Sequence, residues 1–389
     1  MEKIVILTEK HLLQRDYNYF GIKFLKKYFD VVIYDFYEFL NKPKMLFKNS
    51  NKIRGVKVVK ITSLKQFDYN LSKNSFKAAF DYLRTSDLKK TFFFKINLQK
   101  KKILLIRYHN GLLPIFPKYY NFFYKLKNLF YYPELSFVYF KKIYLRFIKN
   151  KELSFIPDIS LVSGLAAKDI YKDEIFIKKK FFTHSVDYSN FLIRKTKLRR
   201  KYIVFIDEMM PNHPDYKIIG LNDNLIDKEN YYYELKKYLK RLSEVTKLDI
   251  KFLAHPKSNL KELKVFFHDF DVILNKTYEM VSSAKLVLAH QSTAISFAII
   301  LRKPLIFLTT NSINKTLYGD KIKFLSKILS CKCINISNSN EFNFKNLNVP
   351  NLIAYKNYLC KYIKHPKSNN ILVWDLIGKY LANIRKKNS

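Results

Sequence analysis

Small polar side chains directly follow two apolar runs in the second half of the chain. The first group is His255-Pro256-Lys257, after the run 252–254, and the second is His290-Gln291-Ser292-Thr293, after the run 286–289. Short apolar runs of this kind predict buried strands that open into loops. In an open α/β sheet, ligands bind beyond the carboxyl ends of the strands, where helix N-termini favour anions. The pattern therefore predicts a phosphate site built from two successive strand ends.

The elements that must position these residues alternate along the whole chain. In the first half, strands are expected at residues 3–8, 31–36, 56–61, 103–108 and 159–163, with a helix at 13–29. In the second half, strands are expected at 202–206, 250–254, 272–274, 286–289 and 304–308, with helices at 231–245, from 278, at 293–301 and at 371–385. Strands that alternate with helices predict an α/β fold with parallel, doubly wound sheets. No Gly-x-Gly-x-x-Gly follows the first strand, so no nicotinamide or flavin cofactor is expected.

The chain is long enough for two hydrophobic cores. At 389 residues and 48% hydrophobic composition, two domains are the natural expectation. We place them at 1–195 and 200–389, with the basic run 194–201 as the linker and the helix at 371–385 closing the second domain.

The chain carries a large excess of positive charge. Its 72 Lys and Arg residues against 32 Asp and Glu give a formal net charge of +40, part of which is the composition expected from an A/T-rich genome. A field of this sign attracts acidic bilayers and nucleic acids. Residues 116–147 interleave aromatic side chains with Lys and Arg, which suits an aromatic core helix, a membrane-surface contact or single-stranded nucleic acid. Nucleic acid is the least favoured partner, because no zinc-finger, ribonucleoprotein or basic-zipper pattern occurs.

Few features point to an exported protein. The cysteines, Cys331, Cys333 and Cys360, suit neither a disulfide framework nor a zinc site. The apolar start of the chain is too short for a signal peptide, and no stretch approaches the roughly 18 apolar residues of a membrane span. We expect a cytoplasmic protein, either free or peripheral on the inner face of the cytoplasmic membrane.

The ordered set of polar strand ends carries a resemblance. Asp207-Glu208 follows the first strand of the second half, His255-Pro256 follows the next strand, and Ser292-Thr293 opens a later helix. This set resembles bacterial GT-B glycosyltransferases that use CMP-activated acidic sugars, the sialyltransferase-like and Kdo-transferase-like enzymes of capsule and lipopolysaccharide assembly. The resemblance covers mainly residues 202–308. It implies two Rossmann-like domains facing across a cleft, an N-terminal one for the glycan acceptor and a C-terminal one for the CMP-sugar donor.

Glycosyl transfer requires a carboxylate to take the proton of the acceptor hydroxyl and a group to stabilise the departing phosphate. Asp207 is the expected base, with Glu208 as the less favoured choice and an N-cap or solvated loop acid as the structural alternative. In retaining relatives such an aspartate attacks the sugar directly, so both stereochemical outcomes stay open. His255 is expected to contact the donor phosphate and, when protonated, to assist its departure, unless it is a capping or core histidine. Pro256 would fix the backbone, and Lys257 would lie close to the sugar carboxylate.

The remaining candidates belong to the nucleotide or line the cleft. Ser292 and Thr293 would form an anion cradle at a helix start, unless they only cap that helix. Glu279 resembles the acid that holds the nucleotide ribose, although a first-turn glutamate is equally expected there. Weaker candidates, which either line the cleft or only end a strand, are His213, Asp215 and His290.

No metal or other cofactor is expected. Asp269-Phe270-Asp271 has the Asp-x-Asp spacing of metal-dependent transferases, but it precedes an apolar strand instead of following one, so it is interpreted as a solvated turn. His365-Pro366-Lys367-Ser368 repeats the letters of residues 255–258 without a preceding apolar strand and is interpreted as a loop.

Two other functions remain open on these residues. A CDP-polyol phosphotransferase, or another nucleotide-sugar transferase, would use the same architecture, although the former normally needs two separate histidine sites. A non-enzymatic basic protein that binds membranes or nucleic acid would need none of the strand-end residues.

Overall fold

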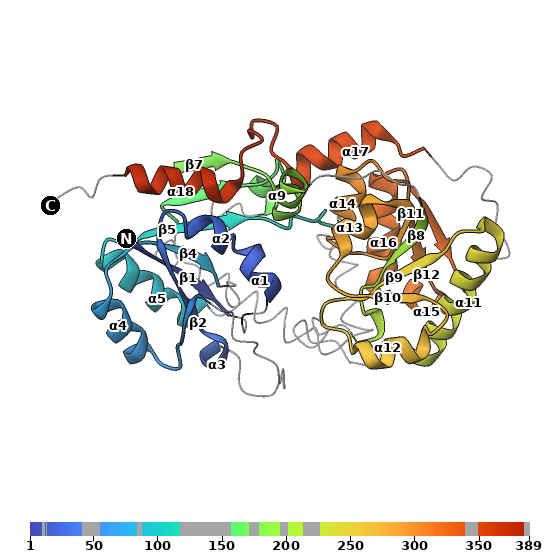
Figure 1. The fold of residues 1–389 in the computed structure, drawn as a ribbon, viewed down its shortest axis with the longest axis horizontal. Coiled ribbons are helices and arrows are strands. Elements are labelled where there is room, and N and C mark those ends of the chain that lie inside the picture. The colour runs from blue at the N-terminus through green and yellow to red at the C-terminus, as the bar shows by residue number, and fades with distance from the viewer. Residues whose placement is uncertain are drawn as a thin grey trace, which may run out of the picture. The chain divides into compact units, whose positions relative to one another are not determined.

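The computed structural model describes residues 1–9, 12, 14–40, 55–83, 88–116, 157–170, 179–194, 201–212, 226–338 and 349–384. The chain forms two compact units. The first comprises residues 1–110, 149–189 and 364–389, and the second comprises 111–148 and 190–363. Each unit is built on one parallel sheet (Figure 1). Among the described residues, no helix is long and apolar enough to cross a bilayer.

The first sheet has seven parallel strands in the order β3-β2-β1-β4-β5-β6-β7. The strands are β1 (Lys3–Thr8), β2 (Asp30–Asp35), β3 (Lys57–Lys60), β4 (Phe76–Tyr82), β5 (Leu104–His109), β6 (Ile159–Val162) and β7 (Lys179–Phe182). The strand order reverses between β1 and β4, as in a doubly wound Rossmann fold. Apart from β4 and β7, these strands match the sequence-based ranges to within one or two residues.

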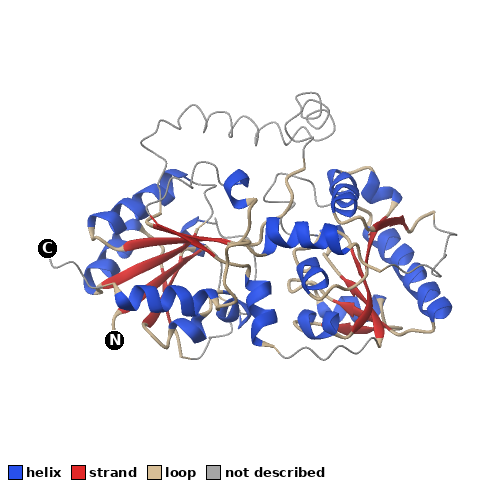
Figure 2. Ribbon diagram, turned by 90° about the horizontal axis from the view of Figure 1, so that it is seen from above, coloured by secondary structure: helices blue, strands red, loops and turns tan. Residues whose placement is uncertain are grey.

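Helices cover both faces of this sheet (Figure 2). On one face, α4 (Leu64–Lys73) and α5 (Leu88–Lys100) pack Phe67 and Phe94 against alternate residues of the strands. On the other face lie α2 (Ile22–Leu25) and α18 (Val373–Asn383). The expected helix at 13–29 is divided, with α1 (Gln14–Tyr19) preceding α2, because Gly21 between them has a left-handed φ of 60°. Further short helices are α3 (Tyr37–Leu40), α8 (Ala167–Ile170) and α9 (Val186–Ile193).

The C-terminal helix α18 belongs to the first unit, whereas it was expected to close the second domain. Trp374 is 2% exposed and lies in the same hydrophobic cluster as Phe29 and Phe80. A Cβ atom at Gly21 would lie 1.9 Å from the Trp374 ring, so the glycine lets α18 approach the backbone between α1 and α2. The red α18 runs beside β7 and α2 in Figure 1. An amphipathic pattern shows that a helix needs an apolar partner, but it does not identify which sheet provides it.

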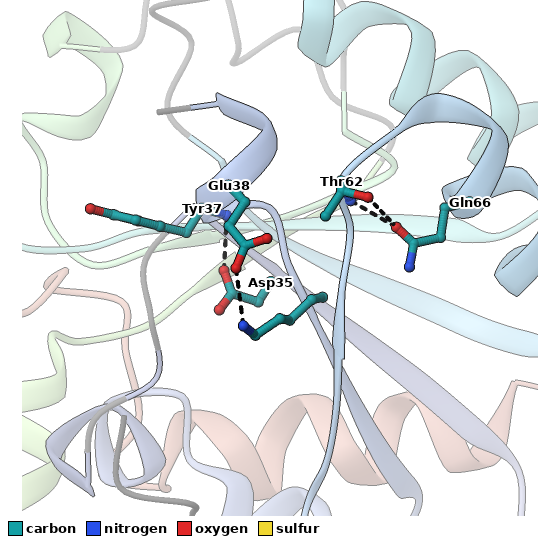
Figure 3. A network of polar contacts seen from close by, with 6 residues as sticks. Asp35, Tyr37, Glu38, Thr62 and Gln66 are labelled. Carbon is teal, nitrogen blue, oxygen red and sulfur yellow. Dashed lines mark hydrogen bonds and ion pairs between the residues drawn. The ribbon is translucent and has the colours of Figure 1, made fainter. Parts of the chain in front are cut away.

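Polar side chains at the carboxyl edge of the first sheet shape its turns (Figure 3). Asp35, at the end of β2, accepts the backbone N–H of Tyr37 at 2.9 Å and so fixes the turn into α3. Gln66 accepts both the N–H and the hydroxyl of Thr62, at 2.8 and 2.9 Å, at the start of α4. These contacts close the loops onto their own helices.

The second sheet has six parallel strands in the order β10-β9-β8-β11-β12-β13. The strands are β8 (Tyr202–Ile206), β9 (Ile250–Leu253), β10 (Asp271–Ile273), β11 (Ala284–Ala289), β12 (Leu305–Thr309) and β13 (Lys332–Asn335). The helices are α11 (Lys228–Thr246), α12 (Leu260–Phe266), α13 (Thr277–Ser282), α14 (Ile295–Ile300), α15 (Asn311–Asn314), α16 (Leu317–Ile328) and α17 (Leu352–Tyr358), with the single turns Met210–Asn212 and Leu359–Ile363. Helices again cover both faces (Figure 2). Numbered within the unit, the order is 3-2-1-4-5-6, which places the reversal between β8 and β11.

Candidate functional site

The polar groups predicted from the sequence lie at the reversal point of the second sheet. The last residue of β8, Ile206, pairs with Leu253 of β9 on one side and with Ala289 of β11 on the other. The three strands therefore end level with one another, immediately before Asp207, Ala254 and His290. The strand ends that were expected to share a site therefore lie at one edge of the sheet. The two strands that precede His255 and Ser292 are not neighbours, however, because β8 lies between them.

Asp207 holds two of these loops together. It is 3% exposed, and its carboxylate accepts the backbone N–H of Met209 at 2.9 Å, the backbone N–H of His255 at 3.3 Å and the hydroxyl of Ser258 at 3.3 Å. Burial raises the pKa of the Asp207 carboxyl, while these hydrogen bonds act in the opposite direction. A carboxylate so enclosed positions the loop after β9 relative to the loop after β8.

The loop after Asp207 bends through an unusual backbone conformation. Met209 has a φ of 55°, in the left-handed region that a residue other than glycine rarely adopts. Such strain costs of the order of 1 kcal/mol and persists only where the surroundings impose it. The hydrogen bond from the Met209 N–H to Asp207 supplies that constraint.

Glu208 faces the opposite neighbour, the loop after β11. Its carboxylate accepts the backbone N–H of Gln291 at 2.6 Å. It also lies near Lys321 of α16, where its charge opposes the lowering of the Lys321 pKa that burial causes. Asp207 and Glu208 therefore link β8 to both flanking strands, and Glu208 is the less buried of the two.

His255 opens a tight turn that displays its side chain at the strand end. The residue is half-buried, its ring Nδ1 accepts the N–H of Lys257 at 3.3 Å, and its carbonyl accepts the N–H of Ser258 at 2.9 Å. Pro256 is exposed and Lys257 is partly exposed. Because Nδ1 acts as an acceptor, the Nε2 atom carries the proton in the neutral ring. A proton on Nε2 suits a group that hydrogen-bonds to an oxyanion.

The second His-Pro-Lys-Ser sequence forms the same turn in the first unit. The Lys367 N–H lies 3.2 Å from His365 Nδ1, and the Ser368 N–H lies 2.8 Å from the His365 carbonyl. No apolar strand precedes it, as expected, and the His365 N–H bonds to the carbonyl of Thr183 after β7. The His365 ring is 7% exposed and stacks on Phe182 at 4.0 Å between centroids. The same four residues thus give a covered histidine here and a partly exposed one at β9.

His290 is a core histidine. It is fully buried, with Nδ1 2.7 Å from the carbonyl of Leu308 and Nε2 2.7 Å from the hydroxyl of Tyr231. The carbonyl can only accept, so Nδ1 carries the proton and the Tyr231 hydroxyl donates to Nε2. Burial lowers the pKa of His290 to about 4. His290 was expected either to line the cleft or only to end a strand, and these buried contacts fit the second role.

Ser292 and Thr293 precede the helix α14, which begins only at Ile295. The Ser292 hydroxyl accepts the N–H of Ala294 at 3.2 Å, and Thr293 is exposed. Neither side chain caps α14, whose N-cap residue, Ala294, makes no side-chain cap bond. The expected anion cradle is therefore a turn that precedes the helix, and its binding of phosphate stays a prediction.

The other candidates lie apart from this cluster. Glu279 in α13 pairs with Arg194, and the next residue, Met280, contacts Tyr202 at the opposite end of β8. Asp269 pairs with Lys236 at 3.0 Å, and Asp271 pairs with Lys251. His213 and Asp215 lie outside the described residues, as does nearly all of segment 116–147. In the described part of the chain, no three His, Cys, Asp or Glu side chains gather as a metal site would require.

Sequence reasoning missed three residues that complete the site. Ser258 bonds to Asp207, Tyr231 bonds to His290, and Gln291 bonds through its backbone to Glu208. Gln291 lies within the second polar group and Ser258 directly follows the first, so their position at a strand end was a usable signal. Tyr231 lies in a helix 59 residues before His290, and only the tertiary structure brings the two together.

Solved structures with a similar fold were found across the whole chain. S. aureus MnaA with UDP gives a TM-score of 0.52 at 10% identity, covering 99% of this chain and 98% of that one. Acinetobacter baumannii MurG gives 0.49 at 8% identity, covering 99% and 100%. The wall teichoic acid polymerase TagF gives 0.49 at 12% identity, covering 98% and 88%. At these sequence identities a structural likeness concerns the fold alone. MnaA, whose TM-score is above 0.5, is the structure that supports the fold assignment.

The chain thus has two Rossmann-like domains of the GT-B type. No protein-family model matches its sequence, and no curated protein matches it. The fold by itself therefore does not identify an activity.

Proposed function

We propose that this protein is a glycosyltransferase that uses a nucleotide-activated sugar. The observation that carries the proposal is the level ending of β9, β8 and β11, which gathers His255, Glu208 and the Ser292 turn at the reversal point of the second sheet. This is where doubly wound sheets bind nucleotides. The likeness of the fold to MnaA, whose structure contains UDP, agrees with the proposal.

The proposed donor is a CMP-activated acidic sugar, a nonulosonic acid such as sialic, legionaminic or pseudaminic acid, or Kdo. The proposed acceptor is an oligosaccharide or a lipid-linked surface glycan. The ordered strand ends at Asp207, His255 and Ser292 support this donor through their resemblance to the CMP-sugar enzymes. The Lys257 ammonium is the proposed partner of the sugar carboxylate.

In the proposed reaction, a carboxylate takes the proton of the acceptor hydroxyl, whose oxygen then attacks the anomeric carbon. The bond from that carbon to the donor phosphate breaks, and CMP departs with the negative charge. His255 stabilises that charge by donating from Nε2, since its Nδ1 already accepts the Lys257 N–H.

The contacts of the two acids favour Glu208 as the base and Asp207 as a positioning residue. The Asp207 carboxylate accepts three hydrogen bonds from neighbouring loop residues of the protein, and Asp207 is only 3% exposed. This burial also disfavours Asp207 as a nucleophile. Glu208 is the more accessible of the two acids.

A thermal-shift screen of the full chain with CMP, UDP, GDP and CDP tests the donor class. A shift specific to CMP supports the proposal, and a shift specific to CDP supports the polyol phosphotransferase instead. A shift with UDP or GDP supports another nucleotide-sugar transferase. If no nucleotide raises the melting temperature, the glycosyltransferase proposal fails.

The two His-Pro-Lys-Ser turns provide a matched pair of variants. An Asn side chain keeps an acceptor for the turn N–H in place of Nδ1 but has no group equivalent to Nε2. His255→Asn is expected to lower kcat/KM for transfer by about 10²–10⁴-fold while His365→Asn leaves it unchanged. Equal effects of the two variants would contradict the placement of the site at β9.

We also propose that residues 116–147 contact an acidic membrane surface, in keeping with a cytoplasmic protein peripheral to the inner face of the membrane. The supporting observation is the interleaving of aromatic and basic residues in that segment. Co-sedimentation with vesicles containing phosphatidylglycerol is expected to fall when Lys125, Lys127, Lys141, Lys142 and Arg146 are replaced by Gln. Unchanged sedimentation, or displacement of the protein from vesicles by single-stranded DNA alone, would contradict it.

A further inference from the structure

A small pocket lies beside the strand ends of the second unit. Its volume is about 150 Å³. Gln291 and Lys321 form its polar side, and its apolar lining is Leu113, Pro114, Ile115, Phe116, Phe324 and Leu325. The rings of Phe116 and Phe324 meet edge to face with centroids 5.3 Å apart, so they form one continuous wall. Cavities of about this volume hold a single six-membered ring.

The polar side of the pocket contains an acceptor with no donor. The side-chain oxygen Oε1 of Gln291 is buried and receives no hydrogen bond from any residue that the structure describes. A buried acceptor left in this state costs about 1–3 kcal/mol. A ligand with a hydroxyl or N–H group recovers that free energy by donating to Oε1.

The charges around the pocket favour a neutral ligand. Lys321 lies near Glu208, so the ammonium and the carboxylate already balance one another. The backbone N–H of Gln291 donates to Glu208 at 2.6 Å, which places the pocket directly beside the proposed base. An anionic group would be repelled by Glu208, whereas a polyhydroxylated ring brings donors and an apolar C–H face without charge.

We propose that this pocket binds the terminal neutral pyranose ring of the glycan acceptor. One ring hydroxyl donates to Gln291 Oε1, and the C–H face of the ring packs on Phe116 and Phe324. The inference rests on the proposed function, because a base beside the pocket has a purpose only if the ring carries the hydroxyl that attacks. The donor sugar fits less well, since its carboxylate would lie near Glu208.

Saturation-transfer NMR on the full chain tests this proposal with methyl β-D-galactopyranoside, methyl β-D-glucopyranoside and methyl N-acetyl-β-D-glucosaminide as probes. At least one glycoside is expected to bind, and Gln291→Leu is expected to weaken its binding about tenfold through the lost hydrogen bond. Gln99→Leu is the matched control, because Gln99 is exposed on α5 of the first unit. CMP binding is measured on the same samples.

The outcomes separate the pocket from the proposed function. Loss of glycoside binding in Gln291→Leu with CMP binding retained supports the proposal, and Phe324→Leu, which thins the apolar wall, must act in the same direction. If Gln291→Leu weakens CMP instead, the pocket holds part of the nucleotide and the proposal is overturned. It is equally overturned if CMP binds the wild-type protein and no glycoside does. If neither CMP nor any other nucleotide binds, the proposed function itself has failed.

Discussion

The backbone N–H of His255 donates to the carboxylate of Asp207 at 3.3 Å, so the residue expected to act as the base also fixes the backbone of the residue expected to meet the phosphate. The bond joins the ends of β8 and β9, 48 residues apart in the chain. Nothing in the spacing of the two motifs distinguishes a catalytic aspartate from one that fixes a neighbouring loop. Their different roles lead to different expectations for stability and activity.

Replacing Asp207 is expected to destabilise the protein as well as inactivate it. Asp207→Ala leaves the N–H groups of Met209 and His255 and the Ser258 hydroxyl without this acceptor, at a cost of roughly 2–4 kcal/mol. Glu208→Gln keeps an acceptor for the Gln291 N–H and is expected to abolish transfer with stability nearly unchanged. Urea unfolding of both variants, alongside transfer assays, checks the pair. A stable, inactive Asp207→Ala would restore Asp207 as the catalytic base.

The strand-end cluster shows which features of the fold and the site can be predicted from the sequence. Apolar runs that end in polar residues located β8, β9 and β11 and placed Asp207, His255 and Ser292 correctly at their ends. The pattern did not give the order of strands in the sheet, which depends on how the helices cross over. It also missed β4, β7 and β13. Lys77 and Asp81 interrupt β4, β7 begins with two exposed lysines, and β13 is a four-residue strand that begins with an exposed lysine. The burial of His290 depends on Tyr231 and Leu308, which lie far away in the sequence.

The core position of His290 predicts a loss of stability in mild acid. Its folded-state pKa is about 4, against 6.5 for an unperturbed histidine, so the unfolded chain binds the proton more readily. The free energy of unfolding should therefore fall as the pH decreases from 6.5 towards 4, by on the order of 3 kcal/mol in total. Thermal melts across this range check the effect. His290→Asn, which keeps a donor for the Leu308 carbonyl, should be less stable at neutral pH and lose this part of the pH dependence. An identical pH profile in the variant would mean that other groups cause it.

The left-handed backbone at Met209 can be tested by substitution. Met209→Gly relieves the strain but adds freedom to the unfolded chain, so its effect on stability is expected to stay within about 1 kcal/mol. Met209→Val is expected to destabilise by roughly 1–3 kcal/mol, because a β-branched residue tolerates this φ poorly. Equal stability of the two variants, measured by urea unfolding, would show that the turn relaxes to another conformation.

No divalent metal is expected to be needed for activity. The Asp269 and Asp271 carboxylates are engaged by Lys236 and Lys251, and Asp271 begins β10 instead of following a strand. Transfer should continue in excess EDTA, and Asp269→Asn should retain wild-type kcat. Activity that is lost in EDTA and restored by Mn²⁺ would contradict this expectation.

The docking of the C-terminal helix on the first unit predicts a large effect at Gly21. An added Cβ would meet the Trp374 ring at 1.9 Å, so Gly21→Ala must displace α18 and is expected to cost roughly 2–4 kcal/mol.

Gly55→Ala is the matched control in the same unit. Gly55 also has a positive φ, of 80°, but the nearest atom to its added Cβ is the flexible Lys26 amine at 3.5 Å. Only the backbone strain, about 1 kcal/mol, is expected there. Trp374 is the single tryptophan of the chain and is 2% exposed, so its fluorescence reports unfolding of the first unit directly. Equal shifts of the fluorescence midpoint in the two variants would show that α18 does not depend on this contact.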